Sequence, residues 1–95
     1  MMEKQIEAHL VKRVRLLGGV AYKFVSPANR GVADRVVCFP DGTTWFVELK
    51  AESGRLSPLQ KVFQSEMARM QQKYTCLWSK EHIDEWLKDL GYDKK

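Results

Sequence analysis

Asp34, Glu48 and Lys50 are the residues whose types and spacing could do chemistry in this sequence. The first carboxylate precedes a short turn, and the second carboxylate and the lysine follow it. If the segments on either side of the turn fold back on each other, the two carboxylates come together. Carboxylate oxygens are hard ligands of the kind that Mg²⁺ and Mn²⁺ prefer. A divalent ion beside a lysine can activate water and stabilise charge on a phosphate, which is the chemistry of phosphodiester hydrolysis.

The segments around the turn have the composition of two paired strands. Residues 33–39 and 43–50 are both rich in Val, Phe and Trp, which favour strands. Pro40-Asp41-Gly42 joins them and suits a three-residue hairpin loop. Proline fits the second position of a type I turn, and glycine fits the position where φ must be positive. We therefore predict an antiparallel hairpin.

The hairpin loop determines the register of the two strands. If Phe39 faces Thr43, Asp34 lies directly opposite Glu48, with Cβ atoms about 5 Å apart and both side chains on one face. Lys50 points to the same face, roughly 7 Å further along its strand. Two carboxylates at this separation repel each other, and one pKa should rise unless a divalent cation binds between them. The hairpin thus presents a candidate metal site with a lysine beside it.

A structural explanation of the same residues stays open. An acid-x-lysine triplet is weak evidence when it stands alone. Asp34 and Glu48 could also be charges at a sheet edge that pair with Arg35 or Lys50. The upstream acid, the turn and the apolar strands together make the constellation more specific than the triplet. Arg35 itself, on the opposite face of its strand from Asp34, is expected to be structural or peripheral.

Gly31-x-x-Asp34 followed by Glu48-Leu49-Lys50 resembles the motif of PD-(D/E)xK nucleases. More narrowly, the chain is similar to the virus-type replication–repair nuclease (VRR-NUC) domain in its stand-alone viral or bacterial form. The proline that is common before the first aspartate of that family is Ala33 here, at a position that carries no catalytic group. The resemblance covers nearly the whole chain, from Glu3 to about Trp78.

The resemblance implies a role for each residue of the motif. Mg²⁺, for which Mn²⁺ should substitute, is expected to bind the carboxylates of Asp34 and Glu48 and the carbonyl of Leu49. Lys50 is expected to orient or activate the attacking water and to stabilise developing charge. No small-molecule cofactor is expected.

An amphipathic helix is predicted over residues 2–17, ended by Gly18-Gly19. Its apolar stripe consists of Ile6, Leu10, Val14 and Leu17. In related nucleases and Holliday-junction resolvases an acid on the first helix completes the site, and Glu3 and Glu7 are the candidates here. Favourable interaction with the helix dipole is a sufficient explanation for Glu3 in the first turn. We favour Glu7, because it lies beside the apolar stripe and its spacing to the closing glycine resembles that of the family.

Basic and polar residues around the hairpin are candidates for contacts to phosphate. Lys23 lies in a predicted strand over residues 20–25, and a loop from Ser26 to Arg30 then leads into the hairpin. Arg55 lies in the polar loop that follows the hairpin. These four residues are the predicted nucleic-acid-binding residues, although a solvated loop explains the residues of the first loop equally well.

Ser57-Pro58-Leu59-Gln60 is a strong helix start, with serine as N-cap, proline at the first helical position and glutamine closing a capping box. The helix is predicted to run to about Gln71. Gln60 has two interpretations that do not exclude each other. It closes the cap, and the resemblance implies that a glutamine at this place lies near the active site, where its amide could hold water or phosphate.

A strand over residues 74–78 and a helix over residues 80–90 complete the predicted order α-β-β-β-α-β-α. The crossover helix should place the last strand parallel to a neighbour. We predict an α/β fold with a mixed four-stranded sheet flanked by helices, as in the restriction-endonuclease-like core. One nuclease domain is expected to span residues 1–95.

Composition restricts the class of protein and its surroundings. No apolar run approaches transmembrane length, so no membrane is expected to be a partner. The first residues lack a signal-peptide pattern and the 2 cysteines lack metal-ligand spacing. Reduced thiols in a cytosolic protein are therefore expected. The resemblance implies that the cytoplasm is that of a bacterial or phage-infected host cell. The 16 basic and 12 acidic residues give a formal net charge of +4, which suits a polyanionic partner.

Together these patterns predict a Mg²⁺-dependent, structure-selective DNA endonuclease. The resemblance implies a homodimer that cleaves branched DNA such as Holliday junctions. Two alternatives stay open. A non-catalytic nucleic-acid-binding module on the same fold would explain the charge but would give Glu48 and Lys50 no reason to converge. A sequence-specific, restriction-type endonuclease would need a recognition domain, for which 95 residues leave little room.

Overall fold

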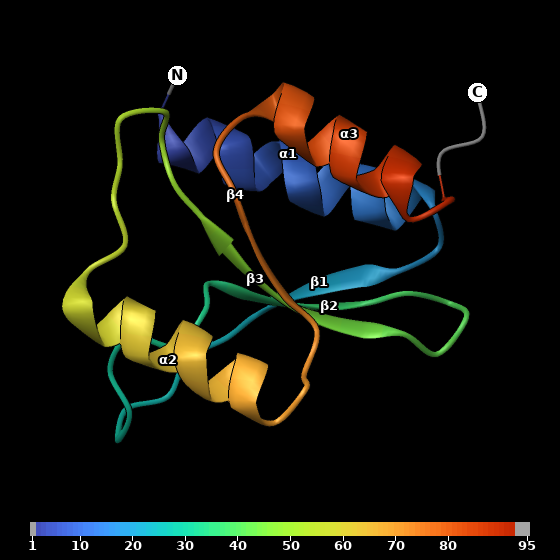
Figure 1. Cartoon of the computed structure of the whole chain (residues 1–95). Helices are drawn as coiled ribbons and strands as arrows, with labels where there is room; N and C mark the ends of the chain where they lie inside the picture. The colour runs from blue at the N-terminus through green and yellow to red at the C-terminus, as the bar shows by residue number, and fades with distance from the viewer. Residues whose placement is uncertain (1, 93–95) are drawn as a thin grey trace.

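The computed structural model describes residues 2–92 of the chain. These residues form the predicted order of elements, α-β-β-β-α-β-α (Figure 1). The helices are α1 (Glu3–Leu16), α2 (Pro58–Arg69) and α3 (Lys80–Asp89). The strands are β1 (Val20–Lys23), β2 (Arg35–Cys38), β3 (Thr44–Leu49) and β4 (Tyr74–Leu77). The predicted fold class is therefore confirmed. Within the described residues, no helix is both long enough and apolar enough to cross a bilayer.

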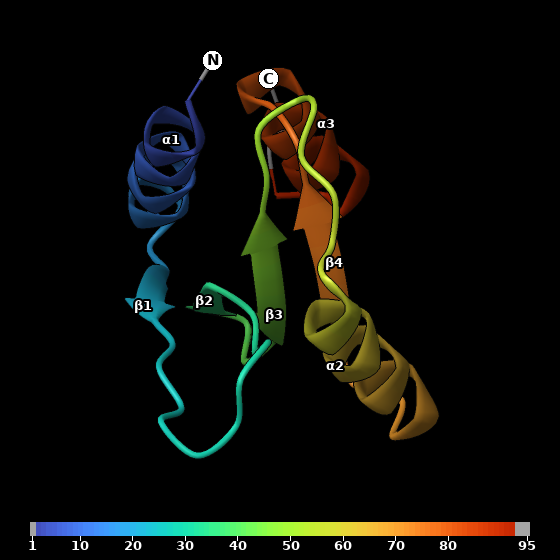
Figure 2. The same ribbon diagram turned by 90° about the vertical axis from the view of Figure 1, so that its left-hand side faces the viewer.

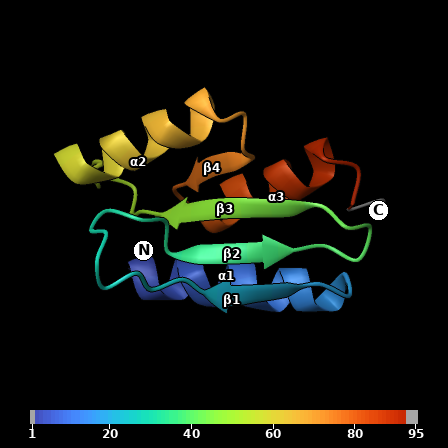
Figure 3. The same ribbon diagram turned by 90° about the horizontal axis from the view of Figure 1, so that it is seen from below.

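The strands form one mixed sheet in the order β1-β2-β3-β4. β2 is antiparallel to β1 and β3, whereas β4 is parallel to β3, as a crossover through α2 allows (Figure 3). Arg35 lies opposite Val47, which is the predicted hairpin register. The same register places Asp34 opposite Glu48, one residue before β2 begins.

The strands are shorter than the sequence predicts. The predicted strand over residues 33–39 is reduced to Arg35–Cys38, and that over residues 20–25 is reduced to Val20–Lys23. The first loop leaves the sheet there, although the Phe24 N–H still donates to the Asp34 carbonyl over 3.0 Å. The loop therefore remains attached to the hairpin at the residue that carries the first carboxylate.

α1 and α3 lie on one face of the sheet and α2 lies on the other (Figures 1 and 2). Fully buried aliphatic side chains fill the space between the sheet and α1 and α3, and the largest come from Ile6, Leu10, Val14, Val37, Val47, Leu49, Leu77, Ile83 and Leu87. The predicted apolar stripe of α1 supplies three of them. Asp84 of α3 bonds to His9 and Arg13 of α1, which ties the two helices together.

The opposite face of the sheet is covered in part. Phe63 of α2 packs against aromatic rings that come from the loop after β1, from β3 and from β4: Phe24, Phe46 and Tyr74. Towards the β1 edge this face is open, because Val20 and Tyr22 are 46% and 58% exposed. α2 therefore shields the half of the sheet that carries Glu48.

Candidate active site

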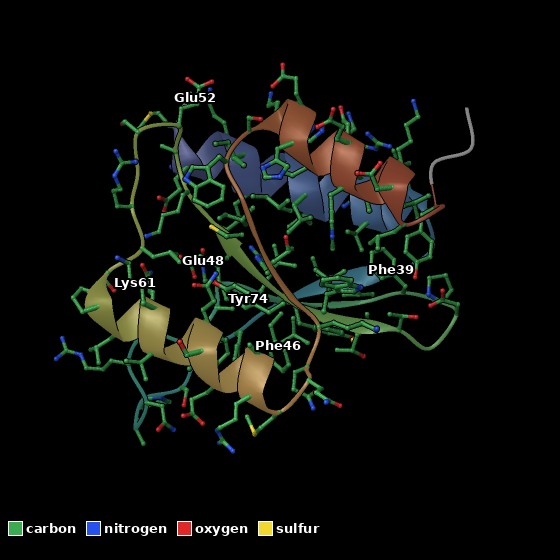
Figure 4. The ribbon with its side chains drawn as sticks, viewed as in Figure 1. Phe39, Phe46, Glu48, Glu52, Lys61 and Tyr74 are labelled. Atoms are coloured by element: carbon green, nitrogen blue, oxygen red, sulfur yellow. The ribbon has the colours of Figure 1, made fainter. Side chains whose placement is uncertain are left out.

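The two predicted carboxylates meet at the end of the sheet where β2 begins and β3 ends. The Leu49 N–H donates to Asp34 Oδ2 over 2.8 Å, which holds the aspartate against β3. Glu48 is 2% exposed and lies between β3 and the first turns of α2 (Figure 4). Burial, and after it the charge of Asp34, raise the pKa of Glu48 to about 7. The carboxylates thus repel each other as predicted from the register.

Two side chains offset the charge of Glu48, and both contact the same oxygen. Lys50 Nζ lies 3.5 Å from Glu48 Oε2, and its positive charge lowers the pKa of the carboxyl group against the two raising effects. Gln60 Nε2 donates to the same oxygen over 2.9 Å. A carboxylate has about four acceptor positions, so Glu48 keeps further capacity to bind a ligand.

Gln60 closes the predicted capping box and also lies beside Glu48; whether its amide holds water or phosphate stays a prediction. Its Oε1 accepts the Ser57 N–H over 2.8 Å, while the Ser57 hydroxyl accepts the Gln60 N–H over 3.2 Å, which is the predicted capping box. Its Nε2 donates to Glu48. The N-terminus of α2 therefore holds the amide in place beside the carboxylate.

The side chain of Lys50 is enclosed by the turn that follows it. It is 14% exposed, and its backbone N–H donates to the Leu77 carbonyl of β4 over 3.0 Å. A Cβ at Gly54 would lie 3.3 Å from both Cβ and Cδ of Lys50, so the glycine packs directly on the lysine chain. The Trp78 indole N–H donates to the Gly54 carbonyl over 3.3 Å. These contacts restrict where the ammonium group can lie.

The donor set fits a hard divalent cation that keeps part of its water. Two carboxylates face each other, and the Leu49 carbonyl lies on the same strand between Glu48 and Lys50. Among residues 2–92, no group of three or more His, Cys, Asp and Glu side chains gathers that could hold an ion. Mg²⁺ commonly binds through one or two carboxylates, with waters and phosphate oxygens completing its shell. The side chains present therefore fit Mg²⁺ better than a metal that needs a full protein cage.

The two candidate acids of α1 have different surroundings. Glu7 Oε2 accepts a hydrogen bond from Arg35 Nε over 2.7 Å and lies 3.8 Å from Lys23 Nζ. Glu3 is exposed in the first turn of α1. Cys76 of β4 lies opposite Glu48 of β3. Burial, and after it the negative charges of Glu48, Asp34 and Glu3, raise the pKa of Cys76 to about 12. The charge of Glu3 therefore acts on a residue that lies beside Glu48.

Comparison with known proteins adds independent observations. No family model matches the chain. A stretch of 58 residues is 55% identical to "Putative nuclease p44" of Acyrthosiphon pisum secondary endosymbiont phage 1, and it spans 61% of this chain and 62% of that protein. A solved structure described as "VRR_NUC domain" superposes with a TM-score of 0.86, over 90% of this chain and 94% of that chain, at 24% identity. The chain has the VRR_NUC fold.

The resemblance read from the motif is thereby confirmed at the level of fold. Within the VRR_NUC fold, the predicted nucleic-acid-binding residues lie in three places. Lys23 is 68% exposed at the end of β1, beside Glu7. Ser26 and Arg30 line a cavity between the first loop and α2. Arg55 is exposed in the loop between β3 and α2.

Three residues near the site were not assigned these contacts from the sequence. Arg35 links α1 to the sheet, because it donates to Glu7 and, over 2.9 Å, to the Ala21 carbonyl. Gly54 packs on the Lys50 side chain, and Trp78 holds Gly54 through a hydrogen bond to its carbonyl. The position of Trp78 could have been found from the sequence, because parallel pairing of β4 with β3 places Trp78 beside Lys50. No local sequence pattern identifies Gly54 as a contact of Lys50, because the turn between them brings the two residues together.

Proposed function

We propose that this chain is a Mg²⁺-dependent DNA endonuclease of the VRR-NUC family, formed by one domain over residues 1–95. The observation that carries the proposal is the meeting of Asp34, Glu48 and Lys50 at one end of the sheet, with Glu48 buried. A buried carboxylate beside a second one costs stability, and a cation bound between the two would offset that cost. The name of the phage relative and the shared fold support the same conclusion.

Asp34, Glu48 and the Leu49 carbonyl are the groups that would hold the ion, and Mn²⁺ should substitute for Mg²⁺. When bound, the ion would polarise a phosphoryl oxygen and lower the pKa of water. Gln60 keeps Glu48 oriented through its 2.9 Å hydrogen bond and presents an amide to water or phosphate. No small-molecule cofactor is part of this proposal.

Lys50 would act on the attacking water and on the charge that develops on the phosphate. Its ammonium lies 3.5 Å from Glu48, and its aliphatic chain packs against Gly54, whose carbonyl accepts the Trp78 indole N–H. A fixed positive charge at the place where negative charge develops lowers the barrier, because no reorganisation is needed during the reaction. The confinement of the side chain therefore supports a catalytic use of Lys50.

Glu7 is the helix acid that we propose to assist at this site, with Glu3 as the alternative. Its ion pair with Arg35 keeps the Glu7 carboxylate near the start of β2, since Arg35 directly follows Asp34. From there it would assist through a water. Lys23, Arg30, Arg55 and Ser26 would contact phosphates of the strand, which the net charge of +4 supports.

Branched DNA such as a four-way junction is the substrate class that we propose, cut by a homodimer in the cytoplasm of a bacterial or phage-infected cell. Resolving a junction needs two cuts on strands related by a two-fold axis, and a C₂ dimer presents two identical sites with that symmetry. The sheet face that stays open at β1, where Val20 and Tyr22 are exposed, supplies apolar surface for self-association.

Cleavage of end-labelled DNA tests the proposal. Linear, nicked, flapped and four-way substrates of equal length are incubated with Mg²⁺ or with EDTA, and light scattering at micromolar concentration gives the mass. We expect Mg²⁺-dependent, paired and nearly symmetric nicks on the junction, made by a dimer. Glu85→Gln, at an exposed position of α3, is the control for Glu48→Gln. A monomer that cuts linear duplex equally well would exclude junction resolution. If Glu48→Gln cleaves as fast as wild type, the carboxylate pair is not the active site.

A further inference from the structure

We propose that the cavity between α2 and the loop after β1 binds an unpaired base of the DNA strand next to the phosphate that is cut. This inference rests on the proposed nuclease function and specifies its substrate. The cavity has a volume of about 340 Å³. The residues that line it belong to the segment that leads into β2 and to α2. That segment and the start of α2 lie at the same end of the sheet (Figure 3).

Each wall of the cavity is close in sequence to a residue of the proposed site. Val32 on the loop side is two residues before Asp34, and Leu59 on the helix side is next to Gln60, whose amide bonds to Glu48. Between the walls the loop touches the helix, because a Cβ at Gly31 would lie 2.6 Å from the backbone of Leu59. This contact fixes the cavity beside the proposed site of phosphate cleavage.

The inner surface of the cavity suits the face of a flat aromatic ligand. The Phe24 and Phe63 rings line it, with centroids 6.4 Å apart and planes tilted by 59°. Val62 adds aliphatic surface and is 56% exposed. Bases stack on such side chains with little dependence on their identity, since every base has a π-face. A phosphate by itself would gain nothing from these apolar groups.

The rim of the cavity suits the polar edge of a base and the strand that carries it. The Asn29 amide donates to the Ser26 hydroxyl over 3.2 Å, so donor and acceptor groups stand together there. Arg30 is exposed at the rim and contributes positive charge. The one carboxylate of the lining, Glu66, pairs with Arg69, which offsets its repulsion of DNA. Aromatic surface inside and positive charge outside match a nucleotide better than an apolar peptide.

A base held in a duplex cannot enter, because its faces are covered by its neighbours. A base at a mismatch, bulge, flap or opened branch point is unstacked at a smaller cost. The cavity therefore gives the enzyme a preference for strands that carry an unpaired base beside the cut phosphate. Stacking of one base on aromatic side chains is expected to lower the Kd for the DNA about tenfold.

The test measures DNA binding in EDTA, so that no strand is cut. The probes are a paired duplex and the same duplex with one unpaired base, in which 2-aminopurine reports stacking by its fluorescence. Val62→Phe fills the cavity from an exposed helical position, and Gln64→Phe introduces the same side chain elsewhere on α2 as control. Arg30→Gln, at an exposed loop position, provides a second variant that does not depend on repacking.

We expect wild type and Gln64→Phe to bind the unpaired-base duplex about tenfold more tightly than the paired duplex. Val62→Phe should lose this preference and the fluorescence change, with its affinity for paired duplex unaltered, and Arg30→Gln should reduce the preference. A wild type without preference, or a preference that survives Val62→Phe, would overturn the inference. So would a Val62→Phe protein whose only change is its mass in light scattering, because the cavity would then bind a second copy of the chain.

Cleavage in Mg²⁺ is measured separately, which keeps the two proposals distinguishable. A wild type that cuts DNA while Val62→Phe retains the unpaired-base preference refutes the cavity and leaves the nuclease. A wild type that cuts no DNA refutes the nuclease, and the cavity's role beside a cut phosphate falls with it, whatever base binding is seen in EDTA.

Discussion

Replacing Glu48 by glutamine should stabilise the metal-free protein above pH 7 and change its stability little at pH 4. Burial, and then the charge of Asp34, raise the pKa of Glu48 from 4.5 to about 7 in the folded protein. The folded state therefore binds the proton more tightly than the unfolded chain. The stability that the protonated carboxyl group contributes is present below about pH 4.5 and is lost as the pH rises to about 7.

The size of this effect follows from the two pKa values. A change from 4.5 to about 7 corresponds to roughly 3 kcal/mol at pH values above the folded pKa. With 2% exposure, the carboxyl group is little screened by solvent. Since 1 kcal/mol moves the melting temperature of a domain this size by about 4–8 °C, an increase of roughly 12–24 °C is expected.

Urea unfolding of wild type and Glu48→Gln in EDTA, between pH 4 and pH 8, measures the effect. The difference in unfolding free energy should grow from near zero at pH 4 and level off above pH 7. All other side chains are common to both proteins, so their contributions largely cancel from the difference. A glutamine variant that is less stable than wild type at pH 8, or a difference that does not vary with pH, would refute the reasoning.

Three further outcomes are expected. Gly54→Ala should lower the single-turnover cleavage rate at saturating DNA, because the added Cβ would lie 3.3 Å from the Lys50 chain and displace its ammonium; the same Cβ would lie 3.1 Å from the Ala51 carbonyl oxygen, so the melting temperature should fall slightly as well. Glu7→Gln should slow cleavage by orders of magnitude, whereas Glu3→Gln should leave the rate unchanged and alter stability by about 0.3–1 kcal/mol in urea unfolding; a reversed result would assign the assisting role to the first turn of α1. Ser57→Ala should cost about 1 kcal/mol of stability in the same measurement, because α2 loses its N-cap.

The parts of the site that could be predicted depend on short stretches of sequence. The loop at Pro40-Asp41-Gly42 determines the hairpin register, and the register alone brings Asp34 opposite Glu48. The capping box at the start of α2 is encoded within four residues, so the position of Gln60 at a helix start followed from it. The order of the elements followed from hydrophobic periodicity in the same way.

The contacts that the sequence did not reveal join segments far apart in the chain. Glu7 and Arg35 are brought together by the packing of α1 on the sheet. Trp78 reaches Gly54 because β4 pairs with β3 and the intervening loop folds back over Lys50. The cavity beside the site likewise requires the close approach of the first loop to α2. Such contacts depend on how elements pack, and no local pattern encodes them.

Calorimetric titration with Mg²⁺ and Mn²⁺ tests most directly whether the carboxylate pair is a metal site. Wild type, Asp34→Asn, Glu48→Gln and the control Glu85→Gln are titrated at pH 6 and pH 8 in buffers of different ionisation enthalpy. We expect binding to wild type and the control, loss of binding in the other two, and release of more protons at pH 6, because Glu48 is then largely protonated. Unchanged metal affinity in both Asp34→Asn and Glu48→Gln would contradict the assignment of the site.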